Sequence, residues 1–217
     1  VRSRMLNSKL NTVEKSAAHQ NKTLLDVGAG TGYFLNHMQS NGWRVKGIEV
    51  SEDARKIAKD KFNIDCFLPS KIFEFKETFD VITLWHVLEH VHDLPSYLNQ
   101  FNNLLNENGR LLIAVPNHTS FDAKHYKSYW AAYDLPRHLW HFEPSTINKL
   151  LSAHNFSLVG KKRMPYDAFY VSLLSEKYKQ SSLASVRGGI IGFASWAQSL
   201  ANIDKCSSLI YIFKKQS

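Results

Sequence analysis

The chain has 217 residues, 44% of them hydrophobic and 21% charged, and its formal net charge is +8. This length and composition suit a single globular domain over 1–217, and the absence of repeats and low-complexity tracts excludes a repeat or fibrous protein. Cys66 and Cys206 lack the spacing of metal ligands, so we expect free thiols in a reducing, cytoplasmic compartment. The chain opens on Val1 without a signal-peptide pattern, and we expect it to be a trimmed chain or a fragment.

The positive charge lies at the two ends of the chain. Residues 1–22 carry five Lys or Arg and one acid, and residues 161–217 carry nine and three, whereas residues 23–160 carry thirteen and fifteen. The middle of the chain is therefore mildly acidic, whereas surfaces that bind nucleic acids are basic. The basic ends are typical of solvated faces, with contact to nucleic acid or to a membrane surface as the alternative.

The first elements surround a glycine-rich loop. Residues 1–22 have apolar side chains at roughly helical spacing and predict a helical cap over one edge of the fold. The apolar run 24–27 predicts a strand that is buried on both faces. Three alternating glycines follow at 28–32 and predict a turn whose backbone lies close to a ligand. A helix over about 31–40 would direct its N-terminal amides at that ligand.

The spacing of the glycines limits which ligand this is. A dinucleotide-binding fingerprint is G-x-G-x-x-G, but here the glycines fall as G-x-G-x-G and Tyr33 takes the place of the third glycine. A second strand over 44–50 carries Glu49 near its end, where a carboxylate can accept both hydroxyls of a ribose. Together the two features favour an adenosine-type ligand without a pyrophosphate.

At this point the chain resembles the class I S-adenosylmethionine-dependent methyltransferases. The resemblance rests on D-V-G-A-G-T-G at 26–32, on Glu49, on the strand and turn at 79–90, and on N-G-R-L-L-I-A-V-P-N at 108–117. It covers residues 23–160, the expected cofactor-binding core, and is most similar to the ubiquinone-biosynthesis-like branch of small-molecule methyltransferases. It implies an α/β fold with a Rossmann-like, mostly parallel seven-stranded sheet, helices on both faces, an antiparallel last strand and a helical insertion at 167–203.

The resemblance also implies S-adenosyl-L-methionine as the cofactor and names the residues that hold it. These cofactor-binding candidates are Asp26, Gly28, Ala29, Gly30, Gly32, Tyr33, Glu49, Val50, Leu84, Trp85 and His86. The acid before the loop would anchor the methionine ammonium through the loop amides, and Glu49 would anchor the ribose. In similar enzymes the N-terminal segment closes over the cofactor, which makes Arg2, Arg4 and Lys9 weaker candidates for its carboxylate.

The later elements alternate between strand and helix. Strands are predicted at about 64–68, 79–84, 110–115, 156–163 and 207–213, and helices at about 52–62, 94–106, 144–154, 167–179 and 183–203. The apolar stretch 188–203 is too short to cross a bilayer, so we expect a helix packed on the sheet or on a partner, with contact to a membrane surface as the alternative.

A histidine- and aromatic-rich stretch at 118–142 is too long for an ordinary connection. Large side chains more often pack than bind, but their place in a connection favours a lid or a wall of the acceptor pocket. The substrate-binding candidates in it are Tyr129, Trp130, Tyr133, Arg137 and Trp140.

His86 is the first candidate for a catalytic base. It follows the strand at 79–84, at the edge where open α/β sheets bind their ligands. A neutral imidazole has the basicity to remove a proton from an acceptor near pH 7. His138 and His141 are rival candidates, and a polar cap of the strand end is the alternative role of His86.

The same segment, H-V-L-E-H at 86–90, matches an inverted zinc-protease signature. We reject that interpretation because the segment follows a buried strand, whereas the signature requires a helix with both histidines on one face. An E-x-x-E-H variant in ubiquinone-type relatives binds a divalent ion, but His86 replaces its first acid. The sequence therefore predicts no metal.

The predicted reaction is direct transfer of the methyl group to a small-molecule acceptor, most simply to an oxygen atom. A nucleic-acid methyltransferase is the first alternative, favoured by the basic ends. It is disfavoured because no N/D-P-P-Y/W-type tetrapeptide follows the fourth strand to stack a flipped base. A cofactor-binding partner protein without turnover is the second alternative. The sequence leaves the oligomeric state open.

Overall fold

A computed structural model describes residues 2–17 and 21–216, and its centre is a seven-stranded sheet in the order β3-β2-β1-β4-β5-β7-β6. The strands are β1 (Thr23–Val27), β2 (Arg44–Ile48), β3 (Cys66–Phe67), β4 (Phe79–Trp85), β5 (Leu105–Pro116), β6 (Phe156–Arg163) and β7 (Ser208–Lys215). The strands β1 to β5 pair in parallel, and β7 runs antiparallel to β5 and to β6. The predicted fold, with its antiparallel last strand, is confirmed.

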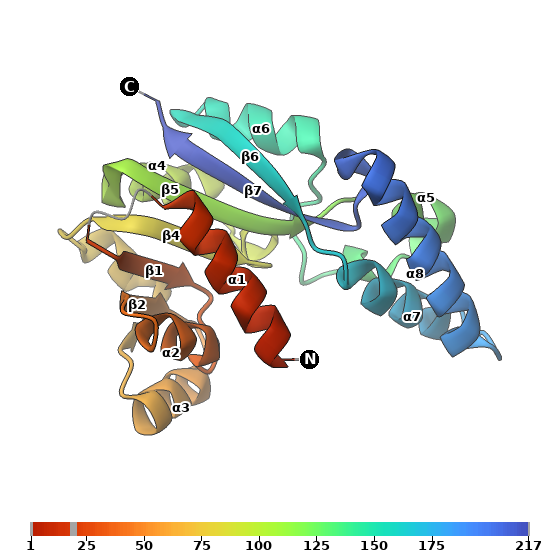
Figure 1. Cartoon of the computed structure of the whole chain (residues 1–217), viewed down its shortest axis with the longest axis horizontal. Coiled ribbons are helices and arrows are strands. Elements are labelled where there is room, and N and C mark those ends of the chain that lie inside the picture. The colour runs from red at the N-terminus through yellow and green to blue at the C-terminus, as the bar shows by residue number, and fades with distance from the viewer. Residues whose placement is uncertain (1, 18–20, 217) are drawn as a thin grey trace.

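Helices cover both faces of this sheet, and α7 and α8 lie side by side beyond one end of it (Figure 1). The helices are α1 (Arg2–Ser16), α2 (Tyr33–Gln39), α3 (Glu52–Phe62), α4 (Leu94–Leu104), α5 (Phe121–Tyr126), α6 (Pro144–Ser152), α7 (Asp167–Tyr178) and α8 (Ala184–Ala201). Short 3-10 turns are η1 (Pro69–Glu74), η2 (Leu88–His90), η3 (Lys127–Tyr129), η4 (Ala131–Tyr133) and η5 (Ile203–Lys205). In the part of the chain that the structure describes, no helix combines the length and apolarity needed to span a bilayer.

Two apolar clusters fill the two faces of the sheet. Leu25 of β1 and Ile82 of β4 belong to one cluster, and their neighbours Leu24 and Val81 belong to the other. Successive side chains of a strand point to opposite faces, so a continuous apolar run is what a strand covered by helices on both sides requires. The prediction of a doubly buried first strand is confirmed.

Two element boundaries differ from the sequence expectation. Helix α2 begins at Tyr33, later than predicted, because Gly32 takes a left-handed conformation with φ +79° at its N-cap. Strand β5 begins at Leu105, earlier than predicted, because Leu105 pairs with Phe79 of β4 before the ladder shifts register. Long-range pairing has overridden the local turn signal of Asn-Gly at 108–109.

Residues 118–142 fold into α5, η3 and η4, where the sequence predicted a lid or a pocket wall. Tyr126 and Trp130 are buried in a third apolar cluster that also includes a valine of α7. Trp130 Nε1 donates a hydrogen bond of 2.8 Å to the buried carboxylate of Asp122. The structure thus places Trp130, a substrate-binding candidate, in a core that joins α7 to the rest of the fold.

Candidate active site

The loop after β1 is shaped by its glycines. Gly28 has φ +79° and Gly30 has φ +54°, in the left-handed region that favours glycine. A Cβ on Gly28 would lie 2.3 Å from Cγ2 of Val87, whereas a Cβ on Gly30 would meet no atom of the described residues within 4 Å. Gly28 is therefore required by the close packing of the loop on the segment after β4, and Gly30 faces open space.

Glu49 follows β2 directly and holds this loop from the neighbouring strand. Its side chain is 9% exposed. Its Oε2 accepts the N–H of Gly30 at 2.7 Å, and its Oε1 accepts the N–H of Ser51 at 2.9 Å. Because β1 and β2 are adjacent and parallel, the acid and the glycine loop meet at the same edge of the sheet. Each carboxylate oxygen keeps a further lone pair with which to accept a ligand hydroxyl.

A cavity of about 500 Å³ lies at this edge. Ile48, Val50, Val91 and Tyr97 give it apolar walls, and Glu49 supplies a carboxylate. Asp93 and two histidines also line it, and Glu49 is its buried acid. A largely apolar cavity with a fixed carboxylate fits the adenine ring and the ribose hydroxyls of S-adenosylmethionine. The sequence did not point to Val91 or Tyr97, because nothing local shows that the segment after β4 folds back over the loop.

The other cofactor-binding candidates are distributed around the loop. Trp85 and His86 line a second cavity, described below. Ala29 and Leu84 are buried, and Gly32 caps α2. The side chain of Tyr33 lies on the outer surface of α2, where its hydroxyl accepts a hydrogen bond from Lys61 Nζ.

Asp26 is buried in β1 beneath the loop and accepts a 2.6 Å hydrogen bond from Thr83 Oγ1. Burial raises the pKa of Asp26 to about 7, although Thr83 and the nearby Lys9 favour its charged form. Burial likewise lowers the pKa of Lys9, while Asp26 and Asp167 favour its charged form. The Lys9 Nζ lies 4.5 Å from the centre of the Trp85 ring. Helix α1 therefore brings a cation close to the cofactor loop; of the three weaker candidates, Lys9 reaches this interior position.

His86 follows β4 with a left-handed backbone, φ +58°, and its ring lies between two carboxylates. Its Nε2 is 3.2 Å from Asp167 Oδ2, and its Nδ1 is 3.4 Å from Glu89 Oε1. Burial disfavours the charged ring, but the two carboxylates outweigh burial and raise the pKa of His86 to about 9. The ring is therefore an imidazolium at pH 7, which differs from the neutral base that the sequence suggested.

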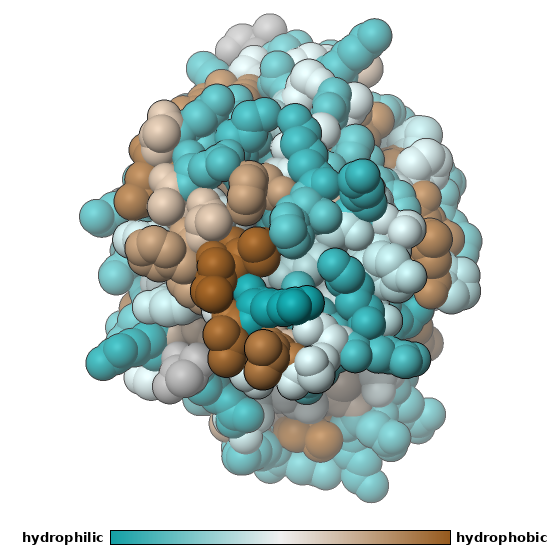
Figure 2. Space-filling model, turned by 90° about the vertical axis from the view of Figure 1, so that its right-hand side faces the viewer, coloured by the Kyte–Doolittle hydropathy of each residue, from teal (hydrophilic) through white to brown (hydrophobic). Residues whose placement is uncertain are grey.

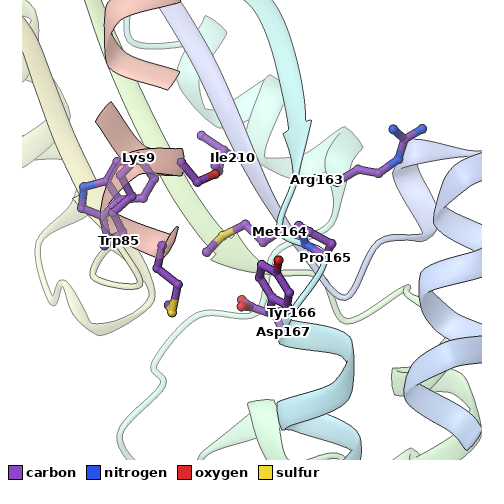
Figure 3. A pocket seen from close by; sticks show the side chains of 10 residues that line it. Lys9, Trp85, Arg163, Met164, Pro165, Tyr166, Asp167 and Ile210 are labelled. Atoms are coloured by element: carbon purple, nitrogen blue, oxygen red, sulfur yellow. The ribbon is translucent and has the colours of Figure 1, made fainter. Parts of the chain in front are cut away.

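A second cavity of about 380 Å³ lies between β4, the segment 131–138 and α7. Trp85, Met164 and Leu174 are among its apolar walls, and His86 and His138 are among its polar ones. A smaller cavity of about 70 Å³ adjoins it, where Lys9 and Trp85 face Met164 and Asp167 (Figure 3). The two cavities share these four side chains, so the hollow extends from α1 to α7.

Of the five substrate-binding candidates, all of which the structure describes, Arg137 alone lines the second cavity, where it pairs with Asp134 at 2.6 Å. The others lie elsewhere: Tyr129 is exposed, Trp130 is buried in the core, Tyr133 packs on Trp130, and Trp140 donates to the carbonyl of Val91. The aromatic content of 118–142 therefore mostly serves packing.

The two other candidate bases, His138 and His141, also differ in whether they line the second cavity. His138 lines the second cavity, and burial lowers its pKa even though Glu89 and Asp134 favour the charged ring. Its Nδ1 lies 2.9 Å from the carbonyl oxygen of Ala132, which assigns the proton of the neutral ring to Nδ1 and the lone pair to Nε2. His141 lies outside that cavity, with its Nε2 3.0 Å from the carbonyl oxygen of Tyr133.

Glu89, His90 and His138 offer ligand atoms that all lie within 4.8 Å of one another. Both carboxylate oxygens of Glu89 are buried, and neither accepts a hydrogen bond from the described residues 2–17 and 21–216. One carboxylate with two imidazoles is a donor set that suits a divalent transition metal. The sequence predicted no metal, and this stays a prediction. His138, the third member of the set, reaches Glu89 and His90 only through the folding of 118–142.

A family model described as a methyltransferase domain matches residues 2–161, well over half of the chain. The match contains α1, the glycine loop, Glu49, His86 and His138, and it ends before α7 and α8.

Individual proteins resemble parts of the chain. The ubiquinone biosynthesis O-methyltransferase of Glaesserella parasuis serovar 5 is 32% identical over 111 residues, which are 46% of this chain and 47% of that protein. An uncharacterized methyltransferase of Alkaliphilus oremlandii is 33% identical over 110 residues, which are 48% of each protein. The chain thus spans about half the length of the curated relatives it matches.

Solved structures share the fold at low identity. Phosphoethanolamine N-methyltransferase 2 of Haemonchus contortus, in complex with S-adenosyl-L-methionine, has a TM-score of 0.64 at 18% identity and covers 97% of this chain and 53% of that one. The family match, the sheet order and the acid that holds the glycine loop agree with one another. The chain belongs to the methyltransferase domain family, among the class I S-adenosylmethionine-dependent methyltransferases.

Proposed function

We propose that the chain transfers the methyl group of S-adenosylmethionine to an oxygen atom of a small, largely apolar acceptor. The second cavity carries the proposal, because its volume of about 380 Å³ and its walls of Trp85, Met164 and Leu174 suit a small molecule with an apolar body. Relatives named as ubiquinone biosynthesis O-methyltransferases support oxygen as the receiving atom.

S-adenosylmethionine supplies a methyl group that its positively charged sulfur already activates. The protein therefore has mainly to bind, to align and to exclude water. Glu49 would hold the ribose hydroxyls, the amides of the glycine loop would hold the methionine part, and Lys9 would pair with its carboxylate. The hollow between α1 and α7 lies next to Trp85, at the edge of the sheet where these groups meet.

The two histidines of the second cavity suit different steps. His86 is an imidazolium whose two N–H groups face Asp167 and Glu89, so it has no lone pair for a proton and supplies a positive charge beside the cavity. His138 is neutral at pH 7, and its Nε2 carries the lone pair. We assign His138, with no metal ion on its Nε2, as the base that takes the acceptor proton, and His86 as the group whose charge stabilises the oxygen anion. A phenol fits this pair, since its anion needs only modest stabilisation.

The test is turnover with isotopically labelled S-adenosylmethionine on a panel of phenols, carboxylates, amines and RNA, with products identified by mass spectrometry. We expect methyl transfer to a phenolic or carboxylic oxygen. His138→Gln should lower kcat and remove the acidic limb of its pH profile, while affinity for S-adenosylhomocysteine is kept. The matched control is His141→Gln, which should leave both unchanged because that ring lies outside the cavity.

Three outcomes contradict the proposal. Transfer to RNA alone, with strongly salt-dependent binding, would favour a nucleic-acid enzyme. Cofactor binding without turnover on any acceptor class would favour a partner protein. Methylation of amines alone would replace oxygen as the receiving atom.

A further inference from the structure

Helix α8 buries its small residues and exposes its large apolar ones. A Cβ on Gly188 would lie 2.8 Å from Cα of Leu173, and a Cβ on Gly192 would lie 2.7 Å from Cα of Phe169. The backbones of α7 and α8 are therefore in close contact along a stripe of small residues. This packing uses only the small-residue face of α8.

The opposite face of α8 is a stripe of large apolar side chains at helical spacing. Its members are Leu183 just before the helix, Val186, Ile190, Phe193 and Leu200, each of them more than half exposed. Figure 2 looks onto this side of the molecule and shows apolar side chains gathered around one strongly hydrophilic side chain. A patch of this kind on a globular domain marks a surface that contacts something else.

The exposed charges on these two helices are all positive. Lys177 and Arg187 are exposed, as is Lys179 at the end of α7. The two acids of α7 turn inward, since Asp167 contacts His86 and Glu176 is 2% exposed. The α7–α8 surface thus combines an apolar stripe with basic side chains and presents no exposed carboxylate on either helix.

Three exposed tyrosines lie on α7 or just before it. Tyr166, Tyr170 and Tyr178 are 60%, 66% and 55% exposed, at and just before α7. A tyrosine pairs an apolar ring with a polar tip, and such side chains are enriched where protein meets the boundary of a lipid bilayer.

We propose that the α7–α8 surface docks on an anionic lipid membrane, with α8 lying along the interface. An amphipathic helix with an apolar face and flanking cations binds such a surface through both hydrophobic burial and charge attraction. A contact between two copies of the chain along α8 is the alternative, and the oligomeric state of the chain tests it.

Tyr170 and Tyr178 line the second cavity and are exposed on α7, the helix that packs against α8. Docking would bring the acceptor cavity to the membrane boundary; this step rests on the proposed function, whereas docking itself does not.

The test is flotation of the full chain with vesicles of phosphatidylcholine alone and of phosphatidylcholine mixed with phosphatidylglycerol. We expect the chain to float with the mixed vesicles and to be released by salt. Ile190→Ser and Phe193→Ser should each lower the partition coefficient by about tenfold, since each removes a large apolar side chain from the contact. Arg187→Gln should lower it by about fivefold.

The matched control is Ile57→Ser, because Ile57 is 43% exposed on α3, at the other end of the molecule (Figure 1). It should float as the parent does. No flotation, or flotation that the α8 variants leave unchanged, overturns the proposal. So does a dimer of the parent in sedimentation that Ile190→Ser converts to monomer, because α8 would then be an interface between copies. Calorimetric titration with S-adenosylhomocysteine, run on the same variants, separates failure of docking from failure of the proposed function.

Discussion

Replacing Glu49 with Gln tests the assignment of the first cavity most directly, because it removes one charge and keeps the shape of the side chain. The carboxylate accepts two backbone N–H groups at 2.7 and 2.9 Å and is 9% exposed, so it is already fixed where a ribose would meet it. Hydrogen bonds to a charged group contribute about 1.5 to 3 kcal/mol. Glu49→Gln should therefore weaken cofactor binding by about tenfold to a hundredfold.

The assay is calorimetric titration of the parent and the variant with S-adenosylmethionine, S-adenosylhomocysteine and NADH. The parent should bind the first two and not the third. Glu52→Gln is the control, since Glu52 is an exposed acid in the first turn of α3 and should leave the affinity unchanged. Unchanged affinity in a folded Glu49→Gln protein would remove this acid from the site, and binding of NADH alone would refute the argument from glycine spacing.

Three further outcomes follow from the geometry. Gly28→Ala should destabilise the chain by about 2 kcal/mol or more, because φ is +79° and the added Cβ meets a side chain at 2.3 Å. Gly42→Ala, with φ +83° and open space around it, should cost only about 1 kcal/mol in urea unfolding, and equal costs would contradict the clash. His86 has a folded pKa of about 9 against 6.5 unfolded, so its pairing stabilises the fold fully below pH 6.5 and is lost as pH rises through about 9. The gap in thermal stability between the parent and His86→Gln should therefore narrow over that range, and a constant gap would show that the ring is not held as an imidazolium. Trp130→Phe leaves a buried carboxylate without one donor and should cost about 1 to 3 kcal/mol, whereas Trp140→Phe, at a 43% exposed side chain, should cost less.

The order of elements and the cofactor edge follow from local sequence. A strand covered on both faces requires a continuous apolar run, and the loop after it has left-handed backbone that favours glycine. Residues 24–32 therefore predict both the strand and the loop. The place of Glu49 at the cofactor edge is also predictable, because adjacent parallel strands end at the same edge of the sheet. These features depend on short stretches of chain, which a sequence displays directly.

The residues at which β5 and α2 begin were harder to predict. Residues 105–109 look like the end of a helix and a turn, yet Leu105 pairs with β4, and the pairing partner is about 26 positions away in the chain. In 118–142, composition showed that the segment is unusual but not which rings are buried, since the third cluster forms only when α7 folds against it.

The sequence by itself determined the succession of strands and helices, the glycine loop and the acid after the second strand, because each depends on a few consecutive residues. The sheet itself was expected from the family resemblance. Tertiary structure alone decided which histidine carries a charge. His86 is an imidazolium because Asp167, from an insertion some eighty positions later, reaches its ring, and His138 is neutral because its segment is buried beside β4. A side chain's protonation depends on the charges and the burial that folding brings to it, and no spacing along the chain records these.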